Sequence, residues 1–398
     1  MKVLLVLTYY QPHVSGLTIY VQRLATALAH RGHQVTVLTS RYDRALPARE
    51  TIDGVDVVRV PVFMRISKGV IMPAFPFIAW RLVRQHDIVS VHLPQFEASL
   101  LALLGRLAGK PVILTYHCDL QLPRGWFNRV VDRVVFISNY LAGLLAQASV
   151  AYTQDFADHS KFLSRFPSKV HIVPPPVIMP KPEPAAVEAF SARHDLFGRP
   201  VVGMAARLAT EKGVEVLIGA MPRLLSEFPR LKVLFAGQYQ DVMGEEAYFQ
   251  RLMPLIRDLG PEHWEFLGIL NQAQMPAFFA ACDVLVVPSL NSTESFGLVQ
   301  VEAMLCGTPS IASNLPGVRQ PPRMTGMGEV TPIGDSAALA EAILRVIKRQ
   351  EDYSRPRRQI EDTFSLERTV SGYEDLFKAL LGGEAWHSQT AEASEPQP

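Results

Sequence analysis

Two glutamates, Glu294 and Glu302, lie in a segment whose pattern is typical of an anion-binding site. Asn291–Glu302 reads NSTESFGLVQVE; it follows an apolar run of strand length, Asp283–Pro288, and continues into an apolar helix, Leu298–Cys306. A strand that leads through a glycine-containing loop to a helix N-terminus presents free N–H groups and the positive end of the helix dipole at one point. Glu294 lies in this loop, and Glu302 can lean back towards it because helical side chains tilt towards the N-terminus.

A second interpretation of this segment is purely structural. Ser292, Thr293 or Ser295 would cap the helix, and Glu302 would lie on a solvated helix face. The two interpretations differ in what caps the helix and in how deeply Glu302 is buried.

Two cations follow another expected strand upstream, in the segment 201–213 (VVGMAARLATEKG). The strand ends at Arg207, and Lys212 opens the next helix. Carboxylates repel a phosphate unless cations neutralise it, and Arg207 and Lys212 can do so from a neighbouring strand end. The two glutamates are then free to accept hydrogen bonds from hydroxyl groups. A diphosphate joined to hydroxyl-rich groups is the chemistry of a nucleotide sugar.

Together these motifs resemble those of the family 4 retaining glycosyltransferases. The motifs are the E-x7-E pattern of Glu294 and Glu302, the ESFG core, the A-R-L-x-x-E-K-G element and a glycine-containing loop after the first strand. They occur in the family's order, and the resemblance spans roughly residues 1–380. It implies an α/β chain with the GT-B fold, in which two Rossmann-like domains with parallel sheets face each other and a C-terminal helix crosses back to the first domain.

The composition fits a two-domain globular protein in a reducing compartment. The chain has 398 residues, of which 48% are hydrophobic and 19% charged. Cys118, Cys282 and Cys306 show no paired or metal-like spacing. We find no signal-peptide pattern and no run of about 18 apolar residues, so we expect a cytoplasmic protein. The first 190 residues are net basic, which would attract an anionic membrane surface or an acidic acceptor.

The chain begins with a βαβ unit. Lys2–Thr8 and Gln34–Thr39 have the pattern of parallel strands and enclose a helix at Leu17–His30. The loop after the first strand lacks G-x-G-x-x-G, which argues against an NAD-dependent oxidoreductase. By resemblance, Gly16 in this loop approaches the phosphate and sugar of the donor, and Ser15 stands where the family often has another glycine.

His117 is expected at the carboxyl end of a later strand. The other elements expected in this half are strands at Asp87–His92, Pro111–His117, Arg133–Ser138 and Lys169–Pro176, and helices at Gln95–Ala108 and Asn139–Ala148. A lone histidine at a strand end is more often structural than catalytic. The resemblance nevertheless implies that His117 contacts the donor sugar near the reacting carbon.

The segment Ile66–Val83 combines apolar and aromatic residues with two prolines and nearby basic side chains. We expect a helix that packs on the sheet after an irregular start. The alternative is an interfacial or acceptor-binding surface, because basic residues flank large apolar ones.

The second half repeats the alternation of strands and helices. Strands are expected at Pro200–Ala206, Leu231–Ala236, Trp264–Leu267, Asp283–Pro288 and Pro309–Ser313, and helices at Asp335–Lys348 and Leu366–Leu381. By resemblance, Leu270 lies where the nucleobase is held, and the last helix crosses back to the first domain.

The expected domain organisation follows from these elements. It comprises an N-terminal acceptor domain at 1–180 with the crossing helix 366–381, a linker at 181–197, a nucleotide-sugar-binding domain at 198–362 and a disordered tail at 382–398.

The predicted activity is retaining transfer of a hexosyl group from a GDP-mannose or UDP-glucose type of donor to a hydroxyl of a lipid-linked or saccharide acceptor. Arg207 and Lys212 would bind the diphosphate, Glu302 the ribose and Glu294 the transferred sugar. The predicted catalytic set is His117, Arg207, Lys212 and Glu294, and the predicted donor-binding set is Gly16, Arg207, Lys212, Leu270, Glu294, Ser295, Phe296, Gly297, Leu298, Val299 and Glu302.

No carboxylate stands out as an attacking nucleophile, and the resemblance implies a front-face route in which the departing phosphate takes the acceptor's proton. We find no D-x-D element placed like a metal site, so we expect no metal and no cofactor beyond the nucleotide sugar, which is a substrate. The expected partners are the donor, the acceptor and the inner face of a membrane as a peripheral surface, but not nucleic acid. A nucleotide-sugar epimerase of similar fold and a non-catalytic sugar-binding protein are the alternatives.

Overall fold

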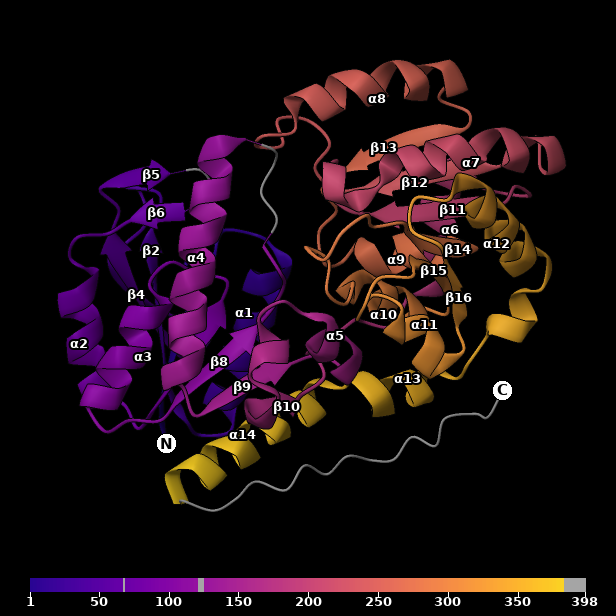
Figure 1. Cartoon of the computed structure of the whole chain (residues 1–398). Coiled ribbons are helices and arrows are strands. Elements are labelled where there is room, and N and C mark those ends of the chain that lie inside the picture. Colours follow the sequence, from indigo (N-terminus) through magenta and orange to yellow (C-terminus); the bar gives the residue numbers. More distant parts are fainter. Residues whose placement is uncertain (67–68, 121–124, 383–398) are drawn as a thin grey trace. The chain divides into compact units, whose positions relative to one another are not determined.

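A computed structural model describes residues 1–66, 69–120 and 125–382 of the chain, and these form two compact units (Figure 1). Unit 1 contains residues 1–117, 125–176 and 366–382, and unit 2 contains residues 118–120 and 177–365. From residue 383 onwards, the tail expected to be disordered lies outside the described residues.

Unit 1 is built on an eight-stranded sheet with the strand order β10-β9-β8-β7-β1-β2-β4-β3. Its strands are β1 (Lys2–Val6), β2 (Gln34–Arg41), β3 (Arg49–Ile52), β4 (Val55–Pro61), β7 (Ile88–Leu93), β8 (Val112–Tyr116), β9 (Ala148–Ala151) and β10 (Val170–Ile172). All neighbouring strands run parallel except β3, which is antiparallel to β4. Every residue of β7 and of β8 is buried, as expected for a parallel sheet that is covered on both faces.

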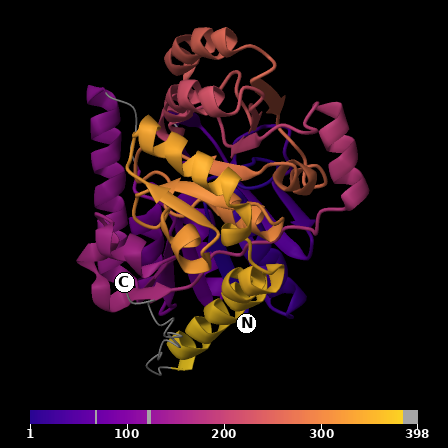
Figure 2. The same ribbon diagram turned by 90° about the vertical axis from the view of Figure 1, so that its right-hand side faces the viewer.

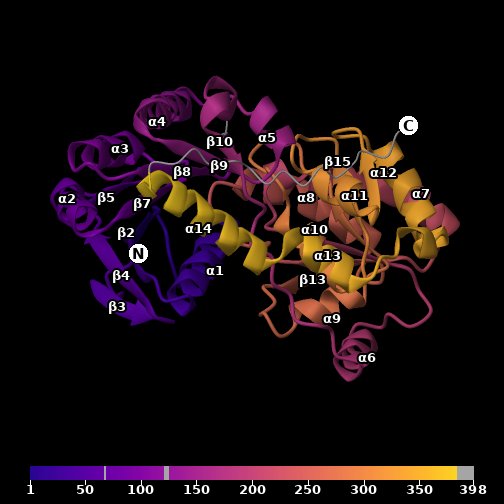
Figure 3. The same cartoon turned by 90° about the horizontal axis from the view of Figure 1, so that it is seen from below.

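Helices cover both faces of this sheet (Figure 3). Helices α2 (Phe75–Gln85), α3 (Ala98–Leu107) and α4 (Trp126–Leu145) lie side by side on one face, and α1 (Gly16–His30) and α14 (Leu366–Gly382) lie on the other. A short helix, α5 (Gln154–His159), follows β9, and a small hairpin of β5 (Met64–Ile66) and β6 (Gly69–Ile71) precedes α2. The expected helix at Ile66–Val83 therefore begins later, at Phe75, and its irregular start contains a strand.

Buried and half-buried polar contacts join the C-terminal helix α14 to the rest of unit 1. The hydroxyl of Tyr373 lies 2.9 Å from the hydroxyl of Tyr20 and 2.7 Å from that of Thr115. Glu374 pairs with Arg31 at 2.6 Å and with His33 at 2.8 Å. A helix thus occurs where Leu366–Leu381 predicted one, and it is an integral part of the first unit.

The strand expected at Arg133–Ser138 is wrong, because this segment lies inside α4. Its run of β-branched residues favours a strand, but Ser138, Asn139, Ala142 and Gly143 form a small, buried helical face. A Cβ on Gly143 would lie 2.5 Å from the Phe166 ring, so this face permits close packing. The sheet position is taken instead by β9, whose first residue, Ala148, was expected to belong to a helix.

Unit 2 is built on a six-stranded parallel sheet with the order β13-β12-β11-β14-β15-β16. Its strands are β11 (Val201–Ala205), β12 (Lys232–Ala236), β13 (Trp264–Gly268), β14 (Val284–Val287), β15 (Ser310–Ser313) and β16 (Gly328–Thr331). Its helices are α6 (Pro184–Arg193), α7 (Val214–Glu227), α8 (Glu246–Leu259), α9 (Met275–Ala280), α10 (Leu298–Leu305), α11 (Gln320–Thr325), α12 (Ser336–Lys348) and α13 (Arg357–Phe364). Figure 2 shows helices on both faces of this sheet.

Both sheets have the strand order of a doubly wound Rossmann-like fold. In each, the order reverses beside the first parallel strand of the unit, at β1 and β7 in unit 1 and at β11 and β14 in unit 2. In open α/β sheets, ligands bind outside the carboxyl ends of the strands at such a switch point. The loops after these four strands are therefore the places where site residues are expected.

Candidate functional site

The loops after β11 and β14 meet at the switch point of unit 2. Gly213 follows the short 3-10 turn η3 (Thr210–Lys212) and has a φ of 66°; a Cβ there would lie 2.1 Å from the carbonyl oxygen of Pro288. The backbone N–H of Leu290 donates to the carbonyl of Glu211 at 2.9 Å. These close approaches bring the end of the A-R-L-x-x-E-K-G element against the segment that leads into the E-x7-E motif.

Lys212 and Glu294 form an ion pair across this junction. The Nζ of Lys212 lies 2.5 Å from Oε2 of Glu294, and both side chains are half-buried. The other carboxylate oxygen of Glu294 accepts a hydrogen bond from the backbone N–H of Gly297 at 3.0 Å. The cation and the first carboxylate of the predicted site are therefore in direct contact. Glu294 is also fixed to the residue from which α10 begins.

Arg207 lies beyond the carboxyl end of β11 and is more exposed. Its guanidinium contacts Glu211 at 3.2 Å, and 46% of its side chain is accessible. A guanidinium has five N–H donors, so this single contact leaves donors for a diphosphate. We call Arg207 the outer cation and Lys212 the inner cation, because the side chain of Lys212 is only 21% accessible.

The N-terminus of α10 is open. Gly297 is its N-cap residue, with a φ of 75°, and no side chain caps the helix in the described part of the chain. Glu302 is buried, at 9% exposure. Both observations contradict the structural interpretation, in which Ser292, Thr293 or Ser295 caps the helix and Glu302 lies on a solvated face. The N–H groups of the first turn, at Leu298 and Val299, remain available to an anion.

Three further residues of the predicted donor-binding set lie in unit 2, outside the contacts of Lys212 and Glu294 described above. Phe296 is buried, with its ring 5.6 Å from that of Phe364, so only its backbone can face a donor. Leu270 is half-buried beyond the end of β13, which is separated from β11 by β12. Ser295 is buried within the loop that carries Glu294.

Unit 1 has its own switch point, where Gly16 is the first residue of α1, directly after the loop that follows β1. Ser15 is the N-cap of α1, and its hydroxyl accepts from the backbone N–H of Thr18 at 3.1 Å. A Cβ on Gly16 would meet no atom within 4 Å, so the backbone there is accessible. Ser15, which stands where a glycine was expected by resemblance, thus satisfies one of the free N–H groups at the N-terminus of α1.

His117 is buried directly after β8, and both nitrogens of its ring are engaged within unit 1. Its Nε2 lies 2.9 Å from Nδ1 of His92, and its Nδ1 contacts the hydroxyl of Tyr152. Burial lowers the pKa of His117, and the neighbouring His92 lowers it further. The ring is therefore neutral at pH 7, and it can act only as a neutral hydrogen-bonding group or through its ring face.

A cluster of aromatic rings that no sequence motif indicated lies at the same edge of unit 1. The rings of Tyr9, His13 and Tyr42 lie 5.0 to 5.9 Å apart. Burial raises the pKa of Tyr9, and Glu97, between β7 and α3, raises it further. Burial also raises the pKa of Glu97 itself to about 7. Only the sheet order reveals this cluster, because its members come from three separate segments of the chain.

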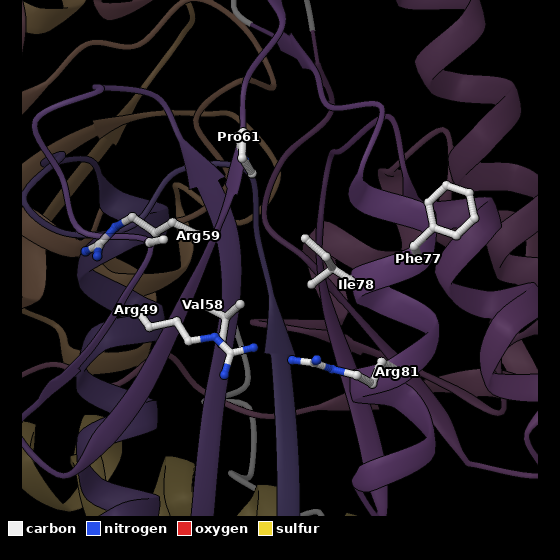
Figure 4. Close-up of a pocket in the computed structure, with 8 residues that line it drawn as sticks. Arg49, Val58, Arg59, Pro61, Phe77, Ile78 and Arg81 are labelled. Atoms are coloured by element: carbon white, nitrogen blue, oxygen red, sulfur yellow. The ribbon is translucent and has the colours of Figure 1, made fainter.

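A pocket of about 380 Å³ opens elsewhere on unit 1 (Figure 4). Arg49 and Arg81 turn their guanidinium groups towards each other across it, and Phe77 lies on the α2 side. Arg59 points away, where its guanidinium donates to the carbonyl of Gln11 at 2.8 Å. None of the lining residues was predicted to bind the donor.

No helix in the described part of the chain is long and apolar enough to cross a membrane.

Comparisons with known proteins cover both units. A family model described as "Glycosyl transferases group 1" matches residues 188–363, and one described as "Glycosyl transferase 4-like domain" matches residues 15–176. A D-inositol 3-phosphate glycosyltransferase of Geodermatophilus obscurus is 30% identical over 406 residues, which cover 94% of this chain and 87% of that protein. A phosphatidyl-myo-inositol mannosyltransferase of Mycobacterium leprae is 26% identical over 350 residues, or 84% of each chain.

Among solved structures, Anabaena HepE in complex with UDP and glucose is similar in fold. The TM-score is 0.75 at 19% sequence identity, and the match covers 95% of this chain and all of that one. This likeness shows the GT-B fold.

Proposed function

The chain belongs to the group 1 glycosyltransferases, family 4, whose members are retaining enzymes, and we propose that it transfers a hexosyl group from a nucleotide sugar to a hydroxyl of a lipid-linked or saccharide acceptor. The observation that carries this proposal is the junction at the unit 2 switch point. There, Lys212 and Glu294 form an ion pair beside the first turn of α10, Arg207 follows the neighbouring strand β11, and Glu302 lies within α10.

In the proposed arrangement, the diphosphate lies between Arg207, Lys212 and the N–H groups that open α10. Binding would exchange part of the Lys212–Glu294 contact for a Lys212–phosphate contact. Glu294, still held by the N–H of Gly297, would then accept hydrogen bonds from the sugar, and the buried Glu302 would accept them from the ribose. Cations placed where charge develops on the leaving group lower the barrier, because their orientation is fixed before the reaction.

The proposed chemical step is a front-face displacement. The acceptor oxygen forms a bond to the anomeric carbon on the side from which the nucleoside diphosphate departs, and the departing phosphate oxygen takes the acceptor's proton. Neither glutamate needs to attack carbon. The nucleoside diphosphate leaves with the bonding electron pair, and the two cations stabilise that charge. Independence from metal ions remains a prediction, which activity in the presence of EDTA would check.

GDP-mannose and UDP-glucose are the donors that we propose to test first. Mannosyl transfer is supported by the name of the Mycobacterium leprae relative, and a UDP-linked sugar by the UDP bound in the HepE structure. The same relative acts on a phosphatidyl-myo-inositol, which supports a lipid-linked acceptor here.

Thermal stabilisation by nucleotides tests the donor site directly. A ligand that binds only the folded state adds about 2.7 kcal/mol at 100 times its Kd. We expect UDP or GDP, and the matching nucleotide sugar, to raise the Tm of the wild type. Lys212→Ala should lose most of that shift because it removes the inner cation.

Lys348→Ala is the matched control, since Lys348 also pairs with a glutamate, Glu227, but on the surface of unit 2. It should keep the full nucleotide shift. Stabilisation by neither nucleotide, or equal shifts in the Lys212 and Lys348 variants, would contradict the proposed donor site.

A further inference from the structure

The layer formed by α2, α3 and α4 exposes an unusual amount of apolar surface. Large hydrophobic side chains that are exposed on these helices are Phe77, Trp80, Leu103, Leu107, Trp126, Phe127, Val130, Val134, Ile137, Leu141 and Leu144. The three helices lie side by side in Figures 1 and 3, so these side chains belong to one layer. Single exposed hydrophobic residues are normal, but a contiguous group marks an interaction surface. We call this surface the α2–α3–α4 face.

The amino-terminal half of α4 is mostly apolar and yet contains no buried residue. None of its residues from Trp126 to Ile137 is buried, although the sequence WFNRVVDRVVFI is mostly apolar. From Phe127 to Leu144, the exposed apolar residues recur at alternating intervals of three and four, which places them along one side of the helix. Between 41% and 52% of each of these side chains is accessible in the described part of the chain, so packing on the core of unit 1 does not fully explain the apolar character of this side.

The same face is basic. Within the three helices, Arg81, Arg84, Arg106, Arg129 and Arg133 stand against a single acidic residue, Asp132, which gives a net charge of +4. None of these arginines forms a salt bridge with a carboxylate of the described residues. At the edge of the face, the pocket between Arg49 and Arg81 also has no acidic lining residue, and its two guanidinium groups face each other as an oxygen-rich anion would require (Figure 4).

We propose that the α2–α3–α4 face docks on a lipid bilayer that contains anionic phospholipid. Exposed aromatic and aliphatic side chains would enter the interface between headgroups and acyl chains, and the arginines would contact the lipid phosphates. A second copy of this chain is a poorer occupant, because pairing the face with itself would bring two surfaces of charge +4 together. This inference goes beyond the proposed function, since it requires no particular donor, acceptor or turnover.

Vesicle flotation of the full chain tests the proposal. We expect binding to vesicles of phosphatidylglycerol and phosphatidylcholine, little binding to phosphatidylcholine alone, and release by high salt. At the usual contribution of a basic residue near an anionic surface, Arg129→Gln combined with Arg133→Gln should lower the partition coefficient roughly 30-fold. The corresponding Arg→Lys variant should retain binding.

The apolar part of the face is tested by Val134→Glu combined with Ile137→Glu, which should abolish flotation. The matched control is Leu255→Glu on α8, because the exposed fractions of Leu255 and Ile137 are 47% and 48%. Circular dichroism melting would verify that all variants fold, whether or not a nucleotide stabilises them. The absence of a nucleotide shift would count against the donor site and would leave the flotation result standing.

Three outcomes would overturn the proposal. The first is no flotation of the wild type on phosphatidylglycerol vesicles, and the second is an equal loss of binding in the α8 control. The third is self-association of the chain that the Val134 and Ile137 substitutions abolish, without any binding to vesicles. That result would assign the face to a second copy.

Discussion

At the scale of single residues, Gly213 sets the distance between the two loops of the candidate donor site. Its φ is 66°, and a Cβ on this residue would lie 2.1 Å from the carbonyl oxygen of Pro288, so there is no space for a side chain. Gly213→Ala should therefore separate the loops and displace Lys212 from Glu294. We expect a loss of stability beyond the roughly 1–3 kcal/mol that a left-handed alanine costs, and a loss of nucleotide binding.

Gly198→Ala is the control for this prediction. Gly198 has nearly the same φ, 68°, but a Cβ there would meet no atom within 4 Å. It should show only the conformational cost, with nucleotide stabilisation unchanged. Thermal melting of both variants with and without nucleotide measures the difference, and equal melting curves for the two would refute the steric argument.

Glu97 predicts a pH dependence at the same scale. Burial raises its pKa to about 7, whereas the ordinary value is 4.5. Between these values the folded chain holds a proton on Glu97 that the unfolded chain has lost, so this group's contribution to stability decreases as pH rises from about 4.5 to 7. Glu97→Gln removes the titration. The Tm of the variant relative to the wild type should increase by a few degrees between pH 5 and pH 8.

Glu183→Gln serves as the comparison, because Glu183 is also an N-cap residue, of α6, but it is exposed. Its Tm relative to the wild type should not change over the same pH range. A pH-independent difference for Glu97→Gln would show that the carboxyl is ionised throughout this range in the folded protein.

At the scale of elements, most strands of unit 2 could be predicted because each is a short apolar run that polar turns interrupt, whereas β16, which reads GEVT, lacks such a run and was not predicted. The predicted strand Asp283–Pro288 contains β14, and the predicted helix at Leu298–Cys306 contains α10. That Lys212 lies at a strand end next to the loop of Glu294 was expected from charge neutralisation, and the direct ion pair depends on β11 and β14 being neighbours in the sheet. Sequence spacing alone does not give sheet order.

The mistaken strand at Arg133–Ser138 has a different physical origin. Val134, Val135 and Ile137 favour a strand by their β-branching, but strand propensity depends on the surface against which a residue packs. In α4 none of these three side chains is buried, and the small residues from Ser138 to Gly143 form the buried face of the helix. The signal that could have identified the helix was therefore the spacing of small residues. The apolar residues of α4 that this packing leaves unburied, such as Val134 and Ile137, belong to the α2–α3–α4 face.

At the scale of the whole molecule, the predicted donor residues divide between the two units. Arg207, Lys212, Glu294 and Glu302 belong to unit 2, whereas Gly16 and His117 belong to unit 1. If the nucleotide is held by unit 2 alone and the sugar also contacts unit 1, the free nucleotide and the complete nucleotide sugar must protect different segments of the chain. Binding of a complete donor would then draw the units together, as in other enzymes that close around their substrates.

Hydrogen exchange in the presence of UDP, GDP or their sugars measures which backbone amides each ligand protects. We expect the free nucleotide to protect amides after β11 and at the start of α10, and the nucleotide sugar to protect, in addition, the loop at Gly16 and the segment that ends at His117. Lys212→Ala should lose both patterns, because the diphosphate anchors the whole donor. Protection that stays within unit 2 even with saturating nucleotide sugar would remove Gly16 and His117 from the donor site, and would leave unit 1 to the acceptor alone.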